Sequence, residues 1–315
     1  MQKTIRSLPL YFSTILIIYM FFFLIISAEH ASIHIVQATE LCIKRIIPSL
    51  FPFMVLNELI VSSGLAKMAG NLFGKPFSKL LKVKKECSSA IISGMLFGFP
   101  LGTKSAVSLY ENGYISKEET EDLICFCSNT GPAFILGFAA PLIGNKPYAI
   151  AIYVSQILSA FAIALLLNRL KKDIKTEICT TCPSPTHSSL TTAVTNSVIP
   201  ILNVCAFVCF FSCITCSLEE LLSFLGMNNT LTVFFSGLLE VSNGISLAAQ
   251  LCDSFTAAVL SAFFIGWSGL SVILQSISVC TQKGISCKKF AAAKLFQGVL
   301  CAFFTFIFCK LMKIY

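Results

Sequence analysis

The chain has 315 residues, of which 56% are hydrophobic and only 12% are charged, and its mean hydropathy is +0.82. This composition excludes an ordinary soluble domain and is typical of a protein that crosses the membrane several times. The net charge of +8 does not indicate nucleic-acid binding, because the basic residues lie in short loops between apolar runs, where they set membrane topology. The 15 cysteines are scattered, mostly within apolar runs, which predicts small apolar side chains rather than a disulfide framework.

The first apolar run covers residues 8–27 and follows Lys3 and Arg6. This pattern predicts a transmembrane anchor with a cytoplasmic N-terminus, and a cleavable signal peptide is the alternative. Residues 29–45 are expected to form an interfacial helix. A short span over residues 46–62 follows, and the lysine-rich loop 64–86 is then expected in the cytoplasm.

Residues 93–104, which read SGMLFGFPLGTK, interrupt the next apolar run near its middle. Pro100 lacks a backbone donor, and Gly98 and Gly102 weaken a helix, so we expect an unwound segment at membrane depth as the chain crosses outward. Thr103 and Lys104 follow directly, and an ionisable residue inside a span is a functional candidate by default. The structural alternative is a proline kink, with Lys104 reaching to the membrane surface.

The acidic segment 117–122 is expected on the outer side of the membrane. The apolar run 123–143 is broken at residues 128–132, and each half is too short to span, which predicts a re-entrant helical hairpin that enters from outside. Residues 148–168 are predicted to cross back to the cytoplasm. The polar segment 169–190 is expected to be a cytoplasmic linker, and zinc or redox chemistry at its lone pair Cys179 and Cys182 is the less favoured interpretation.

The second half of the chain shows the same pattern. Residues 193–216 are predicted to cross outward, residues 231–251 inward and residues 290–308 outward, while the run 254–281, broken at Trp267, is predicted to form a second hairpin from the cytoplasmic side. Short motifs recur in the same order: 93–102 resembles 236–244, 47–50 resembles 199–202, 130–136 resembles 268–274 and 148–151 resembles 290–293, at offsets of 138 to 152 residues. This regular spacing indicates two copies of one unit.

We therefore predict an all-α polytopic membrane protein with two inverted repeats, each of three spanning helices plus a re-entrant hairpin, preceded by one N-terminal transmembrane helix. The expected organisation is an N-terminal transmembrane and interfacial region at 1–45, a first repeat at 46–168, the cytoplasmic linker at 169–190 and a second, inverted repeat at 191–315.

Four polar breaks are expected to converge at the membrane midplane and to bind a solute through free backbone groups and helix termini. The candidate substrate-binding residues are Pro100, Gly102, Thr103, Lys104, Ser128, Asn129, Thr130, Gly131, Ser242, Asn243, Trp267, Ser268, Gly269 and Gln275. Lys104 and residues 128–131 are predicted to hold a carboxylate, and Trp267 to cover an aromatic ring. The structural alternatives are packing hydrogen bonds for Asn129 and Asn243 and an interfacial anchor for Trp267.

Glu240 is the one acidic residue deep within a predicted span. Its functional interpretation is a site that couples transport to a proton or another cation, because a buried carboxylate is easily made to titrate near neutral pH. The alternative is a structural partner for Lys104.

Six segments together carry a family resemblance: PSLFPFMVLNEL at 48–59, SGMLFGFPLGTK at 93–104, YENGYIS at 110–116, CSNTGPAFILG at 127–137, SGLLEVSNGI at 236–245 and GWSGLSVILQ at 266–275. They resemble the sporulation integral membrane protein family of the YlbJ (SpoVV) type. The resemblance implies the "gate" domain named after nucleoside transporters, and a role in moving dipicolinate from the mother cell across the outer forespore membrane.

The first hypothesis is thus a transporter of a small anionic aromatic solute in the cell membrane or the outer forespore membrane. The alternatives are a transporter of nucleosides or other small solutes, a membrane-embedded transferase, and a non-transporting scaffold. The three histidines lie away from the polar breaks and no metal-ligand spacing occurs, so we expect no enzyme activity, no cofactor and no metal site. The expected partners are the solute and the lipid bilayer, without nucleic acid, and a homo-oligomer is left open.

Overall fold

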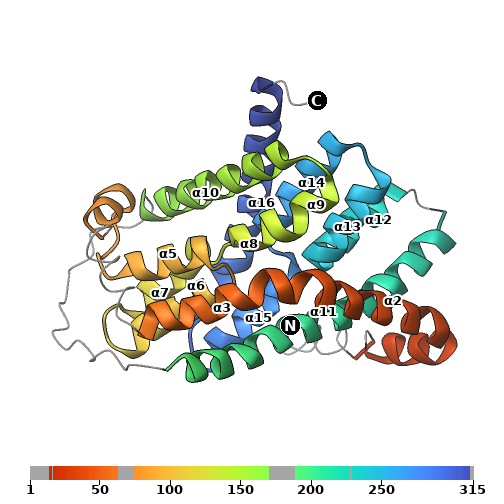
Figure 1. Cartoon of the computed structure of the whole chain (residues 1–315), viewed down its shortest axis with the longest axis horizontal. Helices are drawn as coiled ribbons and strands as arrows, with labels where there is room; N and C mark the ends of the chain where they lie inside the picture. Colours follow the sequence, from red (N-terminus) through yellow and green to blue (C-terminus); the bar gives the residue numbers. More distant parts are fainter. Residues whose placement is uncertain (1–13, 16, 63–73, 170–188, 227–228, 313–315) are drawn as a thin grey trace, which may run out of the picture.

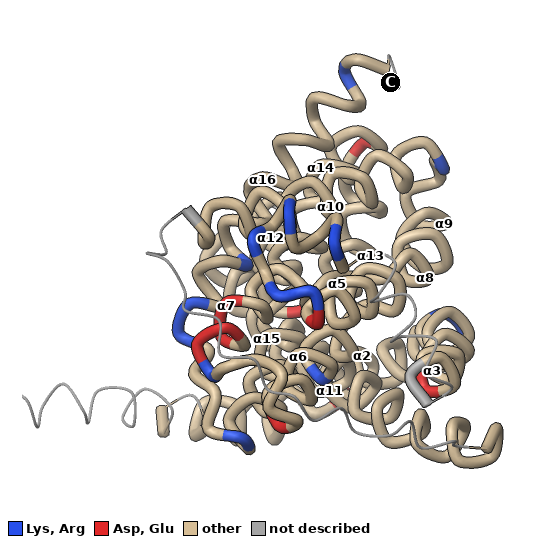
Figure 2. The backbone as a smooth tube through the Cα atoms, turned by 90° about the vertical axis from the view of Figure 1, so that its left-hand side faces the viewer, with Lys and Arg blue, Asp and Glu red and all other residues tan. Residues whose placement is uncertain are grey.

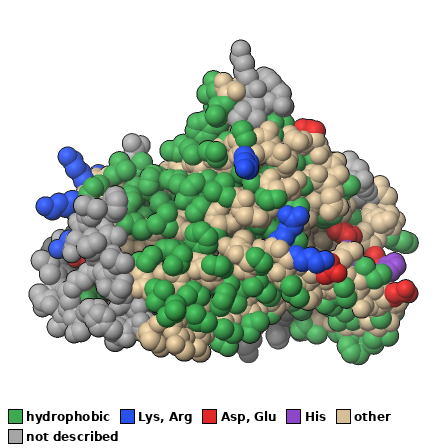
Figure 3. Space-filling model, in the orientation of Figure 1, with side chains coloured by type: hydrophobic (Ala, Val, Ile, Leu, Met, Phe, Trp, Pro, Cys, Tyr) green, Lys and Arg blue, Asp and Glu red, His purple; other side chains and the backbone are tan. Residues whose placement is uncertain are grey.

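The computed structural model describes residues 14–15, 17–62, 74–169, 189–226 and 229–312, and this part of the chain contains helices and no strands (Figure 1). Five of its helices are long and apolar enough to cross a membrane, or up to six if a bent pair is counted as one span. Large hydrophobic side chains such as Ile150, Leu166 and Phe303 are 45–56% exposed, and such side chains cover much of the face in Figure 3. A surface of this kind is suited to contact with lipid. The predicted all-α polytopic class is confirmed.

The N-terminal region folds into a bent pair of helices. Ile17–Ile26 is followed by Ala28–Ile60 at an angle of 99°. The second helix is continuous through α2 (Ala28–Leu41), the π-helix η1 (Cys42–Ile46) and α3 (Ile47–Ser62), and it packs along α11 (Leu190–Phe224). The predicted interfacial helix and the predicted short span therefore belong to one helix.

Two helical hairpins form where the sequence predicts interrupted spans. Helix α5 (Cys87–Leu96) packs against α6 (Leu101–Glu111), and α12 (Asn229–Leu239) packs against α13 (Val241–Leu251). In the first hairpin Gly98 adopts a φ of +82°, which glycine reaches without strain, and Pro100 lies at the N-cap of α6. The prediction that the chain crosses outward through residues 93–104 is wrong, because the chain turns back on itself at that point.

The two segments that were predicted to be hairpins are broken spans instead. The first contains α7 (Lys117–Cys127), α8 (Pro132–Phe134), η2 (Ile135–Ala139) and α9 (Ala140–Ile143), and together they form a 27-residue span. The second contains α14 (Ser254–Trp267) and α15 (Gly269–Thr281) in a 28-residue span. Each break interrupts the helix, but the chain then continues across, so the prediction of re-entrant hairpins at 123–143 and 254–281 is wrong.

Two long helices lie beside the broken spans. Helix α16 (Lys288–Leu311) packs on α14, α7 and α10 (Lys146–Arg169), and α10 also packs on α7 and α14. The broken spans and the two long helices thus form one central group, and the hairpin partners α6 and α13 pack against its broken spans. This arrangement places the polar breaks in the protein interior.

Ion pairs gather several loops at one end of the molecule. Lys84 lies 3.0 Å from Glu119, and Lys289 lies 3.0 Å from Asp122, and Figure 2 shows charged residues concentrated around α7. The prediction that segment 117–122 lies outside while the loop 64–86 lies in the cytoplasm is therefore wrong, because Glu119 and Lys84 are direct neighbours. The cause is the hairpin α5–α6, which returns the chain to the end from which it came.

The opposite end is marked by a second group of residues. Gly144 after α9, Asp253 before α14 and Lys310 at the end of α16 line one shallow cavity. The second hairpin ends at this end, beside Asp253, whereas the first begins near Lys84, so the two hairpins enter from opposite ends. Residues 1–13, which include the start of the predicted transmembrane anchor, and most of the predicted linker, including Cys179 and Cys182, lie outside the described residues.

Candidate functional site

The tip of the first hairpin rests on the break of the first broken span. Residues 128–131 separate α7 from α8, and Ser128, Asn129 and Thr130 are at most 1% exposed. A methyl group added to Gly98 would lie 2.6 Å from the amide nitrogen of Gly131, so the two backbones are in direct contact. This close approach leaves no room for a side chain at Gly98, and a methyl group at Gly131 would lie 3.1 Å from the carbonyl carbon of Phe97.

The body of the first hairpin is held to α7 in the same way. A methyl group added to Gly94 would lie 1.6 Å from the carbonyl oxygen of Cys127, and one added to Gly102 would lie 2.1 Å from it. The thiol of Cys127 donates to the carbonyl oxygen of Gly102 at 3.5 Å. Glycines on both sides of the tip therefore let the hairpin backbone lie on the C-terminal end of α7.

The second hairpin repeats this contact with the second broken span. A methyl group added to Gly269 would lie 3.0 Å from Cγ2 of Val241 and 3.4 Å from Cα of Glu240, at the hairpin tip. The indole nitrogen of Trp267 donates to the carbonyl oxygen of Leu238 at 2.9 Å, at the end of α12. Ser268 has a φ of +74°, which turns the chain between α14 and α15.

The two hairpin–break pairs also touch each other. The hydroxyl of Thr130 in the first break donates to the carbonyl oxygen of Ile265 in α14 at 3.5 Å. The four polar breaks that the sequence predicts to converge are thus arranged as two pairs joined by this contact.

A buried lysine that the sequence analysis did not select lies at the first break. Lys294 is 0% exposed, and its ammonium group donates to the carbonyl oxygen of Ser128 at 2.6 Å and to Oε1 of Gln297 at 2.8 Å. Gln297 in turn donates to Oδ1 of Asn129 at 2.8 Å. Gln156 from α10 donates to the carbonyl oxygen of Thr130 at 2.9 Å, so both long helices hold the break.

Glu240 caps the second half of its own hairpin. Its carboxylate is 2% exposed and accepts the backbone N–H of Asn243 at 2.8 Å, at the N-terminus of α13. A carboxylate is favourable there because the helix N-terminus carries partial positive charge. Among the ion pairs of the described residues, none joins Glu240 to Lys104, whose side chain is exposed.

Three of the four remaining predicted residues lie close to the two tips. Pro100, Thr103 and Ser242 are buried, the hydroxyl of Thr103 has no hydrogen-bond partner among the described residues, and Gln275 is buried farther along α15. The structure therefore groups most of the predicted residues around the two hairpin–break pairs and leaves Lys104 at the surface. Within the described part of the chain, no cluster of three His, Cys, Asp or Glu side chains could hold a metal ion.

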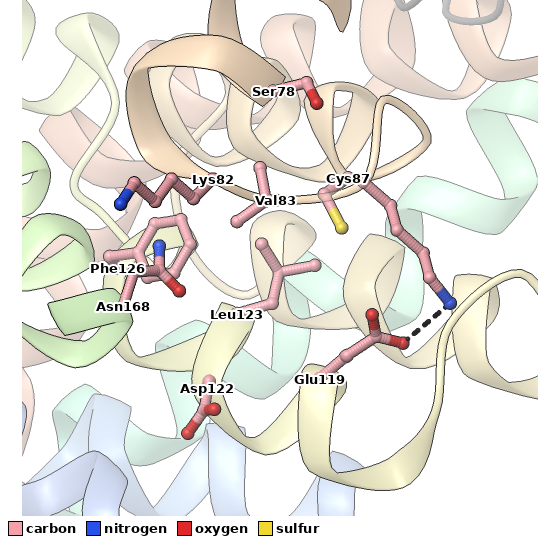
Figure 4. A pocket seen from close by; sticks show the side chains of 10 residues that line it. Ser78, Lys82, Val83, Cys87, Glu119, Asp122, Leu123, Phe126 and Asn168 are labelled. Atoms are coloured by element: carbon pink, nitrogen blue, oxygen red, sulfur yellow. Dashed lines mark hydrogen bonds and ion pairs between the residues drawn. The ribbon is translucent and has the colours of Figure 1, made fainter. Parts of the chain in front are cut away.

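A cavity of about 370 Å³ leads from the lysine-rich end toward the first break. It follows one face of α7 from Glu119 and Asp122 through Leu123 to Phe126, two residues before Ser128. Figure 4 shows the Glu119 carboxylate in its ion pair on one side of this cavity and Lys82, Phe126 and Asn168 on the other.

A second cavity, of about 350 Å³, leads from the other end toward the second hairpin tip. It lies between α2, α11 and α13, and its lining includes His34, Glu219 and Asn243. The hydroxyl of Thr215 and the amide nitrogen of Asn243, which have no hydrogen-bond partner among the described residues, belong to its lining residues. Each cavity thus approaches one of the two hairpin–break pairs.

Comparison with known proteins yields one curated relative. The chain is 27% identical over 307 residues to the sporulation integral membrane protein YlbJ of Bacillus subtilis (strain 168), and the match covers 84% of this chain and 74% of the relative. No protein-family model and no solved structure matches the chain. The similarity supports the resemblance to the YlbJ type, and together with the apolar helices it identifies a multi-pass integral membrane protein.

Proposed function

We propose that this protein transports a small anionic aromatic solute, and that it carries dipicolinate across the outer forespore membrane during sporulation. The observation that carries the proposal is Lys294, a fully buried lysine at the break of a spanning helix. A buried positive charge is costly, so its presence inside a membrane protein favours a functional role. An anion that binds next to Lys294 would compensate this charge.

The proposal includes two inverted repeats of the gate type. Each half contains a long helix, a hairpin, a broken span and a second long helix in the same order, and the hairpins enter from opposite ends. In each half a hairpin tip meets a glycine of the broken span. Interrupted helices at matching positions are typical of transporter binding sites, which makes a scaffold or a transferase the weaker alternative.

We propose that the solute binds between the two breaks. Lys294 supplies the positive charge. Its ammonium group has three N–H donors, and two of them donate to the oxygens of Ser128 and Gln297. Trp267, from the second break, offers an aromatic ring on the side of the other half. A planar aromatic dicarboxylate matches this pairing of a charge with a ring. The sporulation context comes from the name of the Bacillus subtilis relative.

The decisive experiment is uptake into vesicles that contain the purified full-length protein. Labelled dipicolinate is compared with the neutral diamide of the same ring and with uridine, and protein-free vesicles are the control. We expect saturable uptake of dipicolinate and at least about tenfold slower uptake of the diamide. Equal uptake of the acid and the diamide would reject the anionic solute, and uptake of uridine alone would establish the nucleoside alternative.

A further inference from the structure

The first break creates a place that attracts a cation. Helix α7 ends at Cys127, and the last carbonyl groups of a helix have no partner within it. The C-terminal end of a helix also carries partial negative charge. Ser128, Asn129 and Thr130 are buried, so water does not reach these carbonyl groups.

The chain fills this place with its own ammonium group. The nitrogen of Lys294 lies 2.6 Å from the carbonyl oxygen of Ser128 and 2.8 Å from the amide oxygen of Gln297. Both oxygens are neutral, and no ion pair among the described residues involves Lys294. Neutral carbonyl and amide oxygens around one positive charge are the ligands of monovalent-cation sites.

The neighbouring carbonyl groups are satisfied by neutral donors. The side-chain amide of Asn129 donates to the carbonyl oxygen of Phe126 at 2.7 Å, and that of Gln156 donates to the carbonyl oxygen of Thr130 at 2.9 Å. An uncharged amide would therefore be sufficient to satisfy a carbonyl group in this break. The carbonyl oxygen of Ser128 instead accepts from the charged ammonium group of Lys294, and hydrogen bonding alone does not require that charge.

The other half of the molecule lacks this charge. The motif at 148–151 recurs at 290–293, and the same offset of 142 residues relates Lys294 to Ile152. Ile152 is a fully buried apolar residue in α10. A long helix of this type thus packs beside a broken span without a lysine, so Lys294 is a feature of one break and not a requirement of the architecture.

We propose that Lys294 is a built-in monovalent cation: its ammonium group occupies a cation site formed by the first break, in place of a dissolved sodium or potassium ion. The site is complete within the chain. The wild-type protein therefore needs no alkali cation to hold this break in shape, whereas removal of the side chain opens a site for a small cation.

The test measures the thermal stability of the purified full-length protein in detergent. Lys294→Ala is compared with Lys288→Ala, because Lys288 lies on the same helix but is exposed. The probe is n-propylammonium, which replaces the atoms that Lys294→Ala removes, and n-propanol and tetramethylammonium are the neutral and the oversized controls. We expect Lys294→Ala to lower the melting temperature by at least about 5 °C. We expect n-propylammonium alone to restore at least half of that loss, without effect on Lys288→Ala.

Two further measurements make the proposal testable if Lys294→Ala does not fold. Lys294→Met keeps an unbranched side chain that is one atom shorter and carries no charge, and we expect it to be less stable than the wild type. Replacement of sodium and potassium by choline should leave the wild-type melting temperature unchanged. Any one of four outcomes would overturn the proposal. They are equal rescue of Lys294→Ala by n-propanol, no rescue of the folded Lys294→Ala variant, a Lys294→Met variant as stable as the wild type, and a wild-type protein that requires sodium. If dipicolinate uptake fails but n-propylammonium rescues Lys294→Ala, the proposed solute is rejected and the built-in cation is retained.

Discussion

At the scale of single residues, two lysines distinguish a charge inside the site from a charge at its surface. Lys294 is buried at the first break, whereas Lys104 is exposed. We predict that Lys294→Gln slows dipicolinate uptake at least about tenfold, roughly 1.4 kcal/mol, and that Lys104→Gln changes it less than about twofold. Initial uptake rates at matched amounts of folded protein measure both effects. A large loss of uptake from Lys104→Gln alone would assign the anion contact to Lys104, as the sequence predicts.

Glu240 provides a second prediction at this scale. If the carboxylate couples transport to protons, Glu240→Gln should abolish the response of uptake to a pH gradient while solute binding stays measurable. Glu240→Asp is the matched control, because aspartate keeps the charge and is a good N-cap for α13. Uptake in the Gln variant that still follows the gradient would leave Glu240 with a capping role only.

Sequence reasoning selected most of the residues that lie together at the two hairpin–break pairs, and it missed the buried lysine beside them. Pro100, Gly131 and Glu240 interrupt apolar runs, and such interruptions are visible locally. Lys294 was overlooked although it is a single lysine within an apolar segment, and that isolation was the available signal. Its partner Ser128 is 166 residues away in the chain, so no local pattern assigns the lysine to that break.

At the scale of secondary-structure elements, the hairpins depend on glycines that allow backbone contact. A methyl group at Gly102 would lie 2.1 Å from the carbonyl oxygen of Cys127, whereas one at Gly284 would meet no atom within 4 Å. We predict that Gly102→Ala lowers the melting temperature at least twice as far as Gly284→Ala, because only the first change forces two backbones apart. The control still carries the cost of a positive φ, +68° at Gly284. Equal losses would show that the hairpin tolerates separation from α7.

The sequence predicted that each half contains a hairpin and a broken segment but assigned them in the wrong order. A break reveals where a helix stops, whereas the direction of the next helix depends on what it packs against. The glycines around each tip were the missed signal. Gly94 and Gly102 face each other across the first hairpin, as Gly237 and Gly244 do across the second, and small residues at such positions permit close helix pairs.

At the scale of the whole molecule, the ion pairs define which loops share a side of the membrane. We predict that single cysteines at Lys85, Lys117 and Lys283 are labelled from one side, and those at Lys146 and Lys310 from the other, in a cysteine-depleted background. The exposed side chains at these positions make labelling possible. Labelling of Lys85 and Lys117 from opposite sides would restore the predicted outward crossing between them and contradict the hairpin α5–α6.

The two cavities have an electrical consequence. One ends at Phe126 and the other at Asn243, from opposite ends of the molecule. When water fills both, the membrane potential falls mainly across the protein that separates them rather than across the full bilayer. A unit charge moved through a potential of 100 mV changes its energy by about 2.3 kcal/mol. If the proposed transport occurs, an anion would cross most of the voltage between the two cavities, and the rate of its passage would depend on how well the cell keeps that membrane polarised.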